Sequence, residues 1–253
     1  MGDVFGESGL VAVERRLRGL KKLHSADLCV VNGENAAVLG ITPRQAARLF
    51  DAGADAVTLG NHTYHRRDIV NTLRDNPYLI RPLNFSGNLP GNGYCDLYSP
   101  TGLTVRIVNL IGRCFMNDNA SGNPFHAVDK LLKQGGADFY VVDFHAEATS
   151  EKLAMAYHLD GRVSALFGTH THVPTADTRI LPKGTGYVTD LGLCGPVDSV
   201  LGIKPEQAIG SFLGALPDKY EAAGGECKID SVLFEIDEIT KKCTDVIRIE
   251  DKI

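Results

Sequence analysis

The sequence predicts an α/β fold in which β-sheet is covered by α-helices on both faces, and three observations support this. Short apolar runs alternate with helical patterns through much of the 253 residues, which is typical of βα units. Apolar residues make up 43% of the chain, enough for a substantial core. The region from Cys227 to Glu250 alternates like a hairpin with Lys241 and Lys242 at its turn, which adds antiparallel strands to the layers.

The elements follow in order along the chain. Buried strands are predicted for Leu28–Val31, Ala56–Leu59, Phe139–Val142 and Val163–Phe167, and a further apolar run, Leu103–Leu110, follows the Gly- and Pro-rich residues 82–102. Covering helices are predicted for Leu10–Leu23, with Arg and Lys on its outer face, and for Thr42–Ala52, which begins with Thr-Pro and ends at Gly53. Because no repeat or linker interrupts the chain, we expect a single domain over residues 1–253.

Charge and cysteine content narrow the class of protein. The net charge of −5 and the pI near 5.9 give no basic surface for a long nucleic acid, so a phosphate-bearing substrate should be small. Six scattered cysteines without a CxxC pair suit reduced thiols in the cytoplasm. The apolar runs are strand-sized, and Asp3 and Glu7 lie where a signal peptide would be apolar, so we expect neither export nor membrane insertion.

Five short segments carry residues able to bind a metal, four of them where an apolar run stops and one at the chain start. They are Gly2-Asp3, Asn32-Gly33-Glu34-Asn35, Gly60-Asn61-His62, Asp143-Phe144-His145 and Gly168-Thr169-His170-Thr171-His172. Ligand sites of α/β sheets form beyond the carboxyl ends of the strands, so these distant segments are predicted to converge.

The residue types favour borderline-to-hard cations. Imidazole nitrogen, amide oxygen and carboxylate, without thiolate, suit Mn(II), Fe(II) or Zn(II). Two such ions about 3.5–4 Å apart can clamp a phosphate and lower the pKa of a bridging water. Glu34 is the candidate for a carboxylate that bridges them.

The histidine segments each have a plainer alternative. In a strand, His170 and His172 would point to one face and reach two neighbouring metals, although an isolated HxH is more often a pair of hydrogen-bonded loop histidines. Asn61 would ligate through its oxygen while His62 acts as a general acid, although Gly-Asn-His also suits a turn after a strand. His145 would ligate or be a hydrogen-bonded core histidine.

The acidic candidates also have alternatives. Asp3 and Glu34 could be first-turn helix acids, and Asn35 a turn residue. No strand-like run precedes Asp3, so either residues ahead of Met1 in the natural protein supply a strand or Asp3 is held less firmly than its role requires.

The remaining acids and histidines receive no direct role. Glu147 and Glu151 share a face of a helix starting near Thr149 and are interpreted as surface groups or as supports of the ligands. The histidines outside the strand-end pattern are interpreted as solvated or structural: His24, His65, His126 and His158. No GxxxxGK[ST], GxGxxG or GxSxG motif is present in the sequence, which disfavours an ATPase, a dinucleotide enzyme and a serine hydrolase.

Longer stretches carry a resemblance over nearly the whole chain. They are GDVFGESG, VNGENAA, GADAVTLGNHTY, RPLNF, DFHAEATSEK, GTHTHVPTADTRILPKGTGYVTDLG and a downstream GP. They resemble the calcineurin-like metallophosphoesterases and, within them, the YmdB-like 2′,3′-cyclic-nucleotide 2′-phosphodiesterase family. The first motif reads Asp3-Val4-Phe5 instead of Asp-x-His, a departure which that branch shares.

The resemblance implies a fold and a set of site residues. The implied fold is a metallophosphoesterase-type layered β-sandwich flanked by α-helices, in place of a simple doubly wound sheet. The implied first metal is held by Asp3, Glu34, Asn35 and His172, and the second by Glu34, Asn61, His145 and His170, with Glu34 bridging and His62 as proton donor. Iron or manganese is implied, and zinc and magnesium remain open.

The resulting hypothesis is a dinuclear phosphodiesterase of 2′,3′-cyclic nucleotides. A metal-bridging hydroxide would attack phosphorus, and His62 would protonate the leaving 2′-oxygen to give a 3′-nucleotide. The alternatives are a regulatory module that binds a nucleotide or an RNA-linked partner with little turnover, and a general phosphomonoesterase. The expected partner is a small nucleotide, with no membrane, and self-association into a homo-oligomer is left open.

Overall fold

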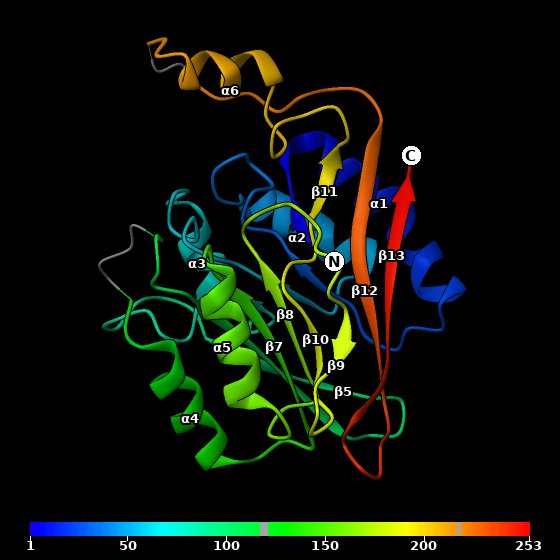
Figure 1. Cartoon of the computed structure of the whole chain (residues 1–253). Coiled ribbons are helices and arrows are strands. Elements are labelled where there is room, and N and C mark those ends of the chain that lie inside the picture. Colours follow the sequence, from blue (N-terminus) through cyan, green and yellow to red (C-terminus); the bar gives the residue numbers. More distant parts are fainter. Residues whose placement is uncertain (117–120, 217–218) are drawn as a thin grey trace.

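Two β-layers pack face to face, and helices cover the outer face of each layer (Figure 1). This arrangement is seen in a computed structural model that describes residues 1–116, 121–216 and 219–253. Apolar side chains fill the space between the layers and the space under each group of helices. The architecture therefore has four layers in the order helix, sheet, sheet, helix.

The first β-layer consists of two sheets that meet edge to edge. One sheet has the order β2-β3-β4 and is parallel, and the other has the order β1-β11-β12-β13. They meet where the backbone N–H of Asn32 donates to the carbonyl of Met1 at 3.3 Å. The strands are β1 Asp3–Val4, β2 Val30–Asn32, β3 Ala56–Thr58, β4 Leu79–Ile80, β11 Leu193–Pro196, β12 Cys227–Ile236 and β13 Cys243–Lys252.

The second β-layer is a six-stranded sheet with the order β5-β6-β7-β8-β10-β9. Its four inner strands are parallel, and β5 and β9 pair antiparallel at its edges. In register, Ile111 lies beside His145, and His145 beside Thr169, so the carboxyl ends of β6, β7 and β8 are level. The strands are β5 Tyr94–Tyr98, β6 Thr104–Ile111, β7 Phe139–His145, β8 Ala165–Thr169, β9 Arg179–Ile180 and β10 Gly186–Val188.

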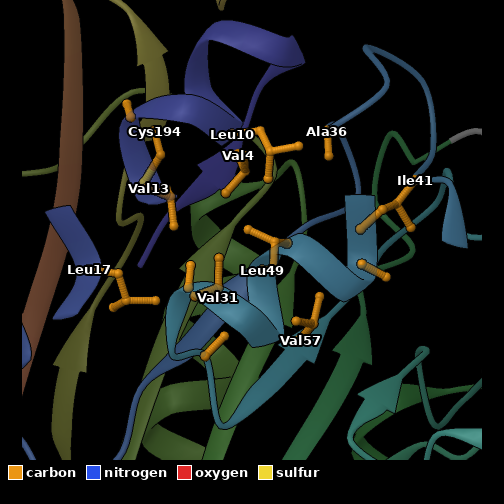
Figure 2. Packing of buried hydrophobic residues seen from close by; sticks show 14 of the residues in the cluster. Val4, Leu10, Val13, Leu17, Val31, Ala36, Ile41, Leu49, Val57 and Cys194 are labelled. Atoms are coloured by element: carbon orange, nitrogen blue, oxygen red, sulfur yellow. The ribbon is translucent and has the colours of Figure 1, made fainter. Parts of the chain in front are cut away.

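The helices pack through apolar stripes on the outer faces of these layers. Leu10 of α1, Leu49 of α2 and Val57 of β3 are fully buried in one cluster (Figure 2). On the other side, α4 and α5 cover β7 and β8 (Figure 1), while α6 projects from the upper edge. The helices are α1 Gly6–Leu23, α2 Pro43–Ala52, α3 Ile69–Asp75, α4 Pro124–Gln134, α5 Thr149–Leu159 and α6 Pro205–Phe212.

The start of α2 shows how local sequence sets an element. The Thr42 hydroxyl accepts a hydrogen bond from the backbone of Gln45, and the Gln45 side chain accepts one from the backbone of Thr42, forming a capping box. Pro43 occupies the first turn, where its missing N–H costs nothing, and Gly53 ends the helix at φ 112°. The predicted helix Thr42–Ala52 is thereby confirmed.

The fold that the sequence predicted is confirmed, with two differences in detail. The simple sheet with helices on both faces is replaced by two face-to-face layers, which is the β-sandwich that the resemblance implied. The strands β7 and β8 extend past the end of their apolar runs, to His145 and Thr169, because the backbone pairing continues through polar residues such as Asp143. In the part of the chain that is described, no helix is long and apolar enough to cross a membrane.

Candidate metal centre

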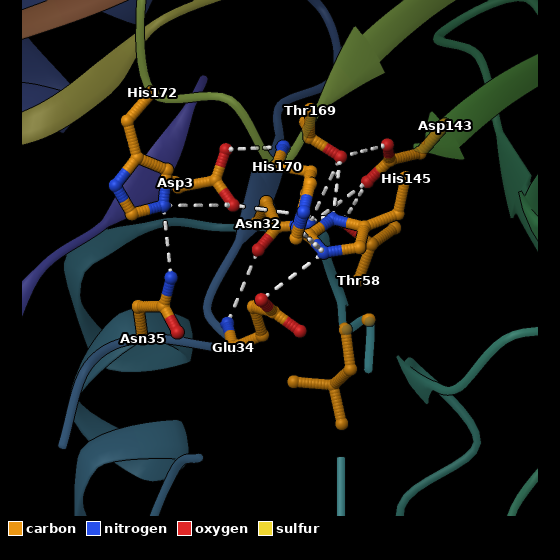
Figure 3. A network of polar contacts seen from close by, with 12 residues as sticks. Asp3, Asn32, Glu34, Asn35, Thr58, Asp143, His145, Thr169, His170 and His172 are labelled. Atoms are coloured by element: carbon orange, nitrogen blue, oxygen red, sulfur yellow. Dashed lines mark hydrogen bonds and ion pairs between the residues drawn. The ribbon is translucent and has the colours of Figure 1, made fainter. Parts of the chain in front are cut away.

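The sequence-predicted ligands meet at one end of the sandwich. Asp3 lies in β1, and Glu34 and Asn35 follow β2 of the first layer, whereas His145, His170 and His172 come from the ends of β7 and β8 in the second layer (Figure 3). Asn61 follows β3 of the first layer. Every one of them has a polar atom within 4 Å of another member of the set. The convergence expected at the strand ends is therefore present.

Asp3 is held firmly although no long strand precedes it. It begins β1, which pairs in parallel with β11, and its backbone N–H donates to the carbonyl of Gly192 at 3.1 Å. The preceding residue, Gly2, donates to the carbonyl of Asp230 at 3.0 Å. Asp3 is fully buried, and these backbone hydrogen bonds hold it although no strand-like run precedes it.

One group of donors fits a single cation. Ligand atoms of Glu34, His145 and His170 all lie within 4.8 Å of one another. The Nε2 atom of His145 is 3.0 Å from Oε1 of Glu34, 3.0 Å from Oδ1 of Asn61 and 3.1 Å from Nδ1 of His170. Two imidazoles and a carboxylate thus lie within reach of a common point, and the amide oxygen of Asn61 contacts one of the imidazoles.

A second group lies beside the first. Oδ1 of Asp3 is 3.7 Å from Nε2 of His172 and 4.0 Å from Nδ1 of His145. Nδ2 of Asn35 is 2.9 Å from the same Nε2 of His172. Glu34 acts on both groups, since its carboxylate reaches His145 and its charge also affects Asp3 and His172.

Two orphaned carboxylate oxygens show that this donor set fits a metal. Oδ1 of Asp3 and Oε1 of Glu34 are buried and accept no hydrogen bond from any residue that the structure describes. A buried carboxylate oxygen without a hydrogen-bond donor is costly although the second oxygen of each group has one, and a divalent cation would satisfy both oxygens. The nitrogen and oxygen donors, with no cysteine sulfur among them, suit iron, manganese or zinc.

Nδ1 of His145, the ring nitrogen that faces away from Glu34, has a hydrogen-bond partner. The hydroxyl of Thr169 donates to Oδ1 of Asp143 at 2.7 Å, so its oxygen accepts from Nδ1 of His145 at 2.9 Å. In the neutral imidazole, Nε2 then carries the lone pair, and it faces Glu34. Orientation of this kind is the usual support for a metal-binding histidine.

The other two histidines are oriented in the same way. Nδ1 of His172 donates to the carbonyl of Leu201 at 2.9 Å, which leaves Nε2 toward Asp3. Nε2 of His170 lies 3.1 Å from the carboxylate of Glu147, which leaves Nδ1 toward His145. Glu147, which sequence analysis interpreted as a surface group or a support, thus supports His170.

Burial and charge set the ionisation of the cluster. Burial opposes ionisation of Glu34, but His145 and His62 outweigh it and hold the pKa of Glu34 well below its usual value. Burial, together with the charge of His145, lowers the pKa of His170 to about 3, so this imidazole is neutral at pH 7. Burial disfavours the charge on His172 as well, yet Asp3 raises its pKa to about 9. A cation bound by His172 would displace that proton.

The HxH segment differs from the strand geometry that was expected. The strand β8 ends at Thr169, and both His170, at φ 96°, and His172, at φ 62°, adopt left-handed backbone conformations. Such a conformation costs an L-residue roughly 1–2 kcal/mol. The turn sends the two imidazoles in different directions, with His170 toward His145 and His172 toward Asp3.

His62 lies at the rim of the cluster with its own support. Its Nδ1 is 2.9 Å from Oδ1 of Asn35, and its backbone N–H donates to Oε2 of Glu34 at 3.1 Å. In this arrangement the Asn35 oxygen faces His62 and its nitrogen faces His172, so a ligand role for Asn35 requires the amide to turn over. The exposed ring of His65, which sequence analysis left outside the site, lies 4.9 Å from the His62 ring.

A buried polar layer beneath the cluster was missed from the sequence. The Asp143 carboxylate accepts hydrogen bonds from Thr58, Thr169 and the Asn32 side chain (Figure 3). Burial raises the pKa of Asp143 to about 6. The available signal was a polar residue inside a strongly apolar strand, at Thr58 and at Asp143.

Comparison with known proteins agrees with this geometry. The chain is 41% identical over 252 residues to the 2′,3′-cyclic-nucleotide 2′-phosphodiesterase of Bacillus subtilis (strain 168), covering 98% of this chain and 94% of that protein. A crystal structure of a novel phosphatase from Mycoplasma pneumoniae superposes with TM-score 0.93 at 37% identity, covering 99% of this chain and 91% of the other. A hypothetical protein from Thermus thermophilus gives TM-score 0.92 at 38% identity, covering 99% of this chain and 97% of that one.

The layered fold and the His/Glu cluster at its strand ends define an enzyme of the metallophosphoesterase type. Residues 1–249 match the model of the YmdB-like protein family. The chain belongs to that family, and the resemblance that its motifs carried is confirmed.

Proposed function

We propose that this protein is a dinuclear metal-dependent phosphodiesterase that hydrolyses 2′,3′-cyclic nucleotides to 3′-nucleotides. The observation that carries the proposal is the cluster of Glu34, His145 and His170, whose buried carboxylate oxygen has no hydrogen bond among the described residues. The substrate class is supported by the name of the Bacillus subtilis relative, at 41% identity over almost the whole chain. The acidic pI of the present chain suits a small substrate better than a long nucleic acid.

The proposed ligands fall into two sets that share one carboxylate. Asp3, Glu34, Asn35 and His172 form the first set, and Glu34, Asn61, His145 and His170 form the second. Iron or manganese is the proposed metal. Bound cations would lower the pKa of a water nucleophile and neutralise charge on the phosphoryl oxygens.

The protein's own residues supply the remaining chemistry. Nδ1 of His62 is hydrogen-bonded to Asn35, so Nε2 is the atom that carries the proton to the leaving 2′-oxygen. The side chain of His62 is 20% exposed, which allows contact with a substrate entering from solvent. Glu147, Thr169 and Leu201 fix the three ligand histidines before the substrate arrives.

The test is product analysis with purified protein, Mn(II) and 2′,3′-cyclic AMP. We expect 3′-AMP as the product, and loss of that product in Asn61→Ala and His145→Ala, whose wild-type side chains meet at 3.0 Å. Release of inorganic phosphate would instead indicate a phosphomonoesterase. Binding without turnover would indicate a regulatory module.

The cysteines bear on the cellular compartment in which the protein acts. All six are free and four are buried, which suits a reducing compartment. We therefore include the cytoplasm in the proposal, with residues 1–253 acting as one domain.

A further inference from the structure

The turn that carries two of the proposed ligands needs support from outside the cluster. His170 and His172 both have positive φ, and Thr171 lies between them. A turn in this sparsely populated conformation persists only where neighbouring groups determine it. The groups that hold Thr171 are therefore candidates for a role in the metal centre, and the following inference rests on the function proposed above.

One carboxylate, that of Asp190, holds Thr171 by two hydrogen bonds. Oδ2 of Asp190 accepts from the Thr171 hydroxyl at 2.7 Å and from the Thr171 backbone N–H at 3.2 Å. The two bonds fix both the side chain and the peptide plane of the residue between the ligands. Asp190 is itself 1% exposed, so solvent does not compete for these bonds.

Lys152 of α5 supplies the charge that balances Asp190. Its Nζ donates to Oδ2 of Asp190 at 2.6 Å, and both side chains are fully buried. The lysine stem passes β8 at Gly168, where a Cβ would clash with the carbonyl oxygen of Thr189 and lie 2.9 Å from Cδ of Lys152. Glycine at this position thus leaves room for both the Thr189 backbone and the lysine stem.

The other oxygen of Asp190 is connected by hydrogen bonds to Asp3, a proposed ligand in the opposite layer. Oδ1 accepts from the N–H of Gly192 at 2.9 Å, and the carbonyl of Gly192 accepts from the N–H of Asp3 at 3.1 Å. The N–H of His170 in turn donates to Oδ2 of Asp3 at 3.2 Å. Asp190 is therefore connected to Asp3, His170 and His172.

We propose that Lys152 and Asp190 are positioning residues that hold the His170-Thr171-His172 turn, and with it Asp3, in the geometry that binds both cations. They act through Thr171 and Gly192 and are not among the proposed ligands. Loss of the Thr171 hydroxyl should therefore weaken metal binding without unfolding the protein.

The decisive variant is Thr171→Val, which removes the hydroxyl and leaves no buried charge unpaired. Its control is Thr185→Val, since the buried Thr185 hydroxyl also donates one bond, to the carbonyl of Val163 at 2.7 Å, in another part of the sheet, and in addition accepts one from the N–H of Gly161. Thr171→Ser restores the hydroxyl. Each protein is loaded with Co(II), and we measure the dissociation constant by chelator competition, the visible absorption spectrum of the bound ion, and the melting temperature.

In Thr171→Val we expect a 10- to 100-fold larger dissociation constant for Co(II) and an altered Co(II) spectrum. Losses of this size are usual when a group that orients metal ligands is removed. Thr185→Val should keep the wild-type spectrum, and Thr171→Ser should recover it. The role of Asp190, the charged partner of Thr171, is tested by Asp190→Asn. The control is Asp160→Asn, because the Asp160 carboxylate also accepts hydrogen bonds from backbone N–H groups, those of Lys183 and Thr185.

Two outcomes overturn the proposal, and they are distinguishable. Wild-type affinity and spectrum in Thr171→Val would remove the positioning role while leaving the metal centre intact. Failure of the wild-type protein itself to bind Co(II) would remove the metal centre and, with it, the proposed function.

Discussion

Replacing His62 with alanine should slow hydrolysis of a poor leaving group far more than hydrolysis of an activated one. The 2′-alkoxide of a cyclic nucleotide needs a proton as it departs, whereas p-nitrophenolate does not. His62 is oriented for this donation by its 2.9 Å hydrogen bond to Asn35. A general acid contributes about 10²- to 10⁴-fold, which corresponds to about 3–5 kcal/mol at about 1.4 kcal/mol for each factor of ten.

The assay compares kcat/KM for 2′,3′-cyclic AMP and for bis(p-nitrophenyl) phosphate. In His62→Ala we expect about a 10²- to 10⁴-fold loss on the cyclic nucleotide and a loss of less than about tenfold on the aryl ester. His65→Ala is the matched control, because its exposed ring lies 4.9 Å from that of His62 without reaching the cluster, and it should retain both activities. Equal losses on the two substrates in His62→Ala would refute the general-acid role.

Four further outcomes are expected. Glu34→Gln keeps the shape of the shared carboxylate but removes its charge, so bound metal and turnover should both fall at least about tenfold; unchanged metal content by mass spectrometry would exclude Glu34 as a ligand. Dialysis against a chelator should abolish activity, and Mn(II) or Fe(II) should restore it; activity that survives full metal removal contradicts the mechanism. Leu49→Ala, at a fully buried position of α2, should cost about 2–5 kcal/mol in urea unfolding, against less than about 0.5 kcal/mol for the exposed Leu23→Ala. Thr42→Ala removes the capping box and should cost about 0.5–2 kcal/mol; a midpoint equal to that of Leu23→Ala would argue against the cap.

The elements and the convergence of the ligands could be predicted because their signals are local. Strand-end positions of Asn61, His145 and His170 follow from apolar runs that stop at polar residues, and the carboxyl ends of parallel strands meet at one edge. The Thr-Pro start and Gly53 end of α2 are equally local. Motif length, and not composition, carried the narrower family assignment.

The remaining features depend on contacts between distant segments. The positive φ of His170 and His172 could not be predicted from the residue type, since only a small share of histidines adopt it. Lys152 and Asp190 are 38 positions apart, and they meet because α5 packs against β8 and β10, the strand that Asp190 follows. The orientation of Asn35 toward His62 likewise depends on where the β3 loop meets the β2 loop.

The local sequence also could not predict that two β-layers pack face to face, in place of one sheet covered by helices. Val141 of β7 is partly buried and packs in the space between the layers, yet a strand covered by helices on both faces would carry the same apolar pattern. The resemblance supplied that choice, and the structure confirmed it.

The central claim is that Glu34 lies between two cations. Metal analysis of protein purified without chelator, combined with an anomalous-scattering map of its crystals, tests it most directly. We predict two peaks about 3.5–4 Å apart, one beside Asp3 and His172 and one beside His145 and His170, with Glu34 contacting both. A map without a peak at either position, from protein that is active, would contradict the account.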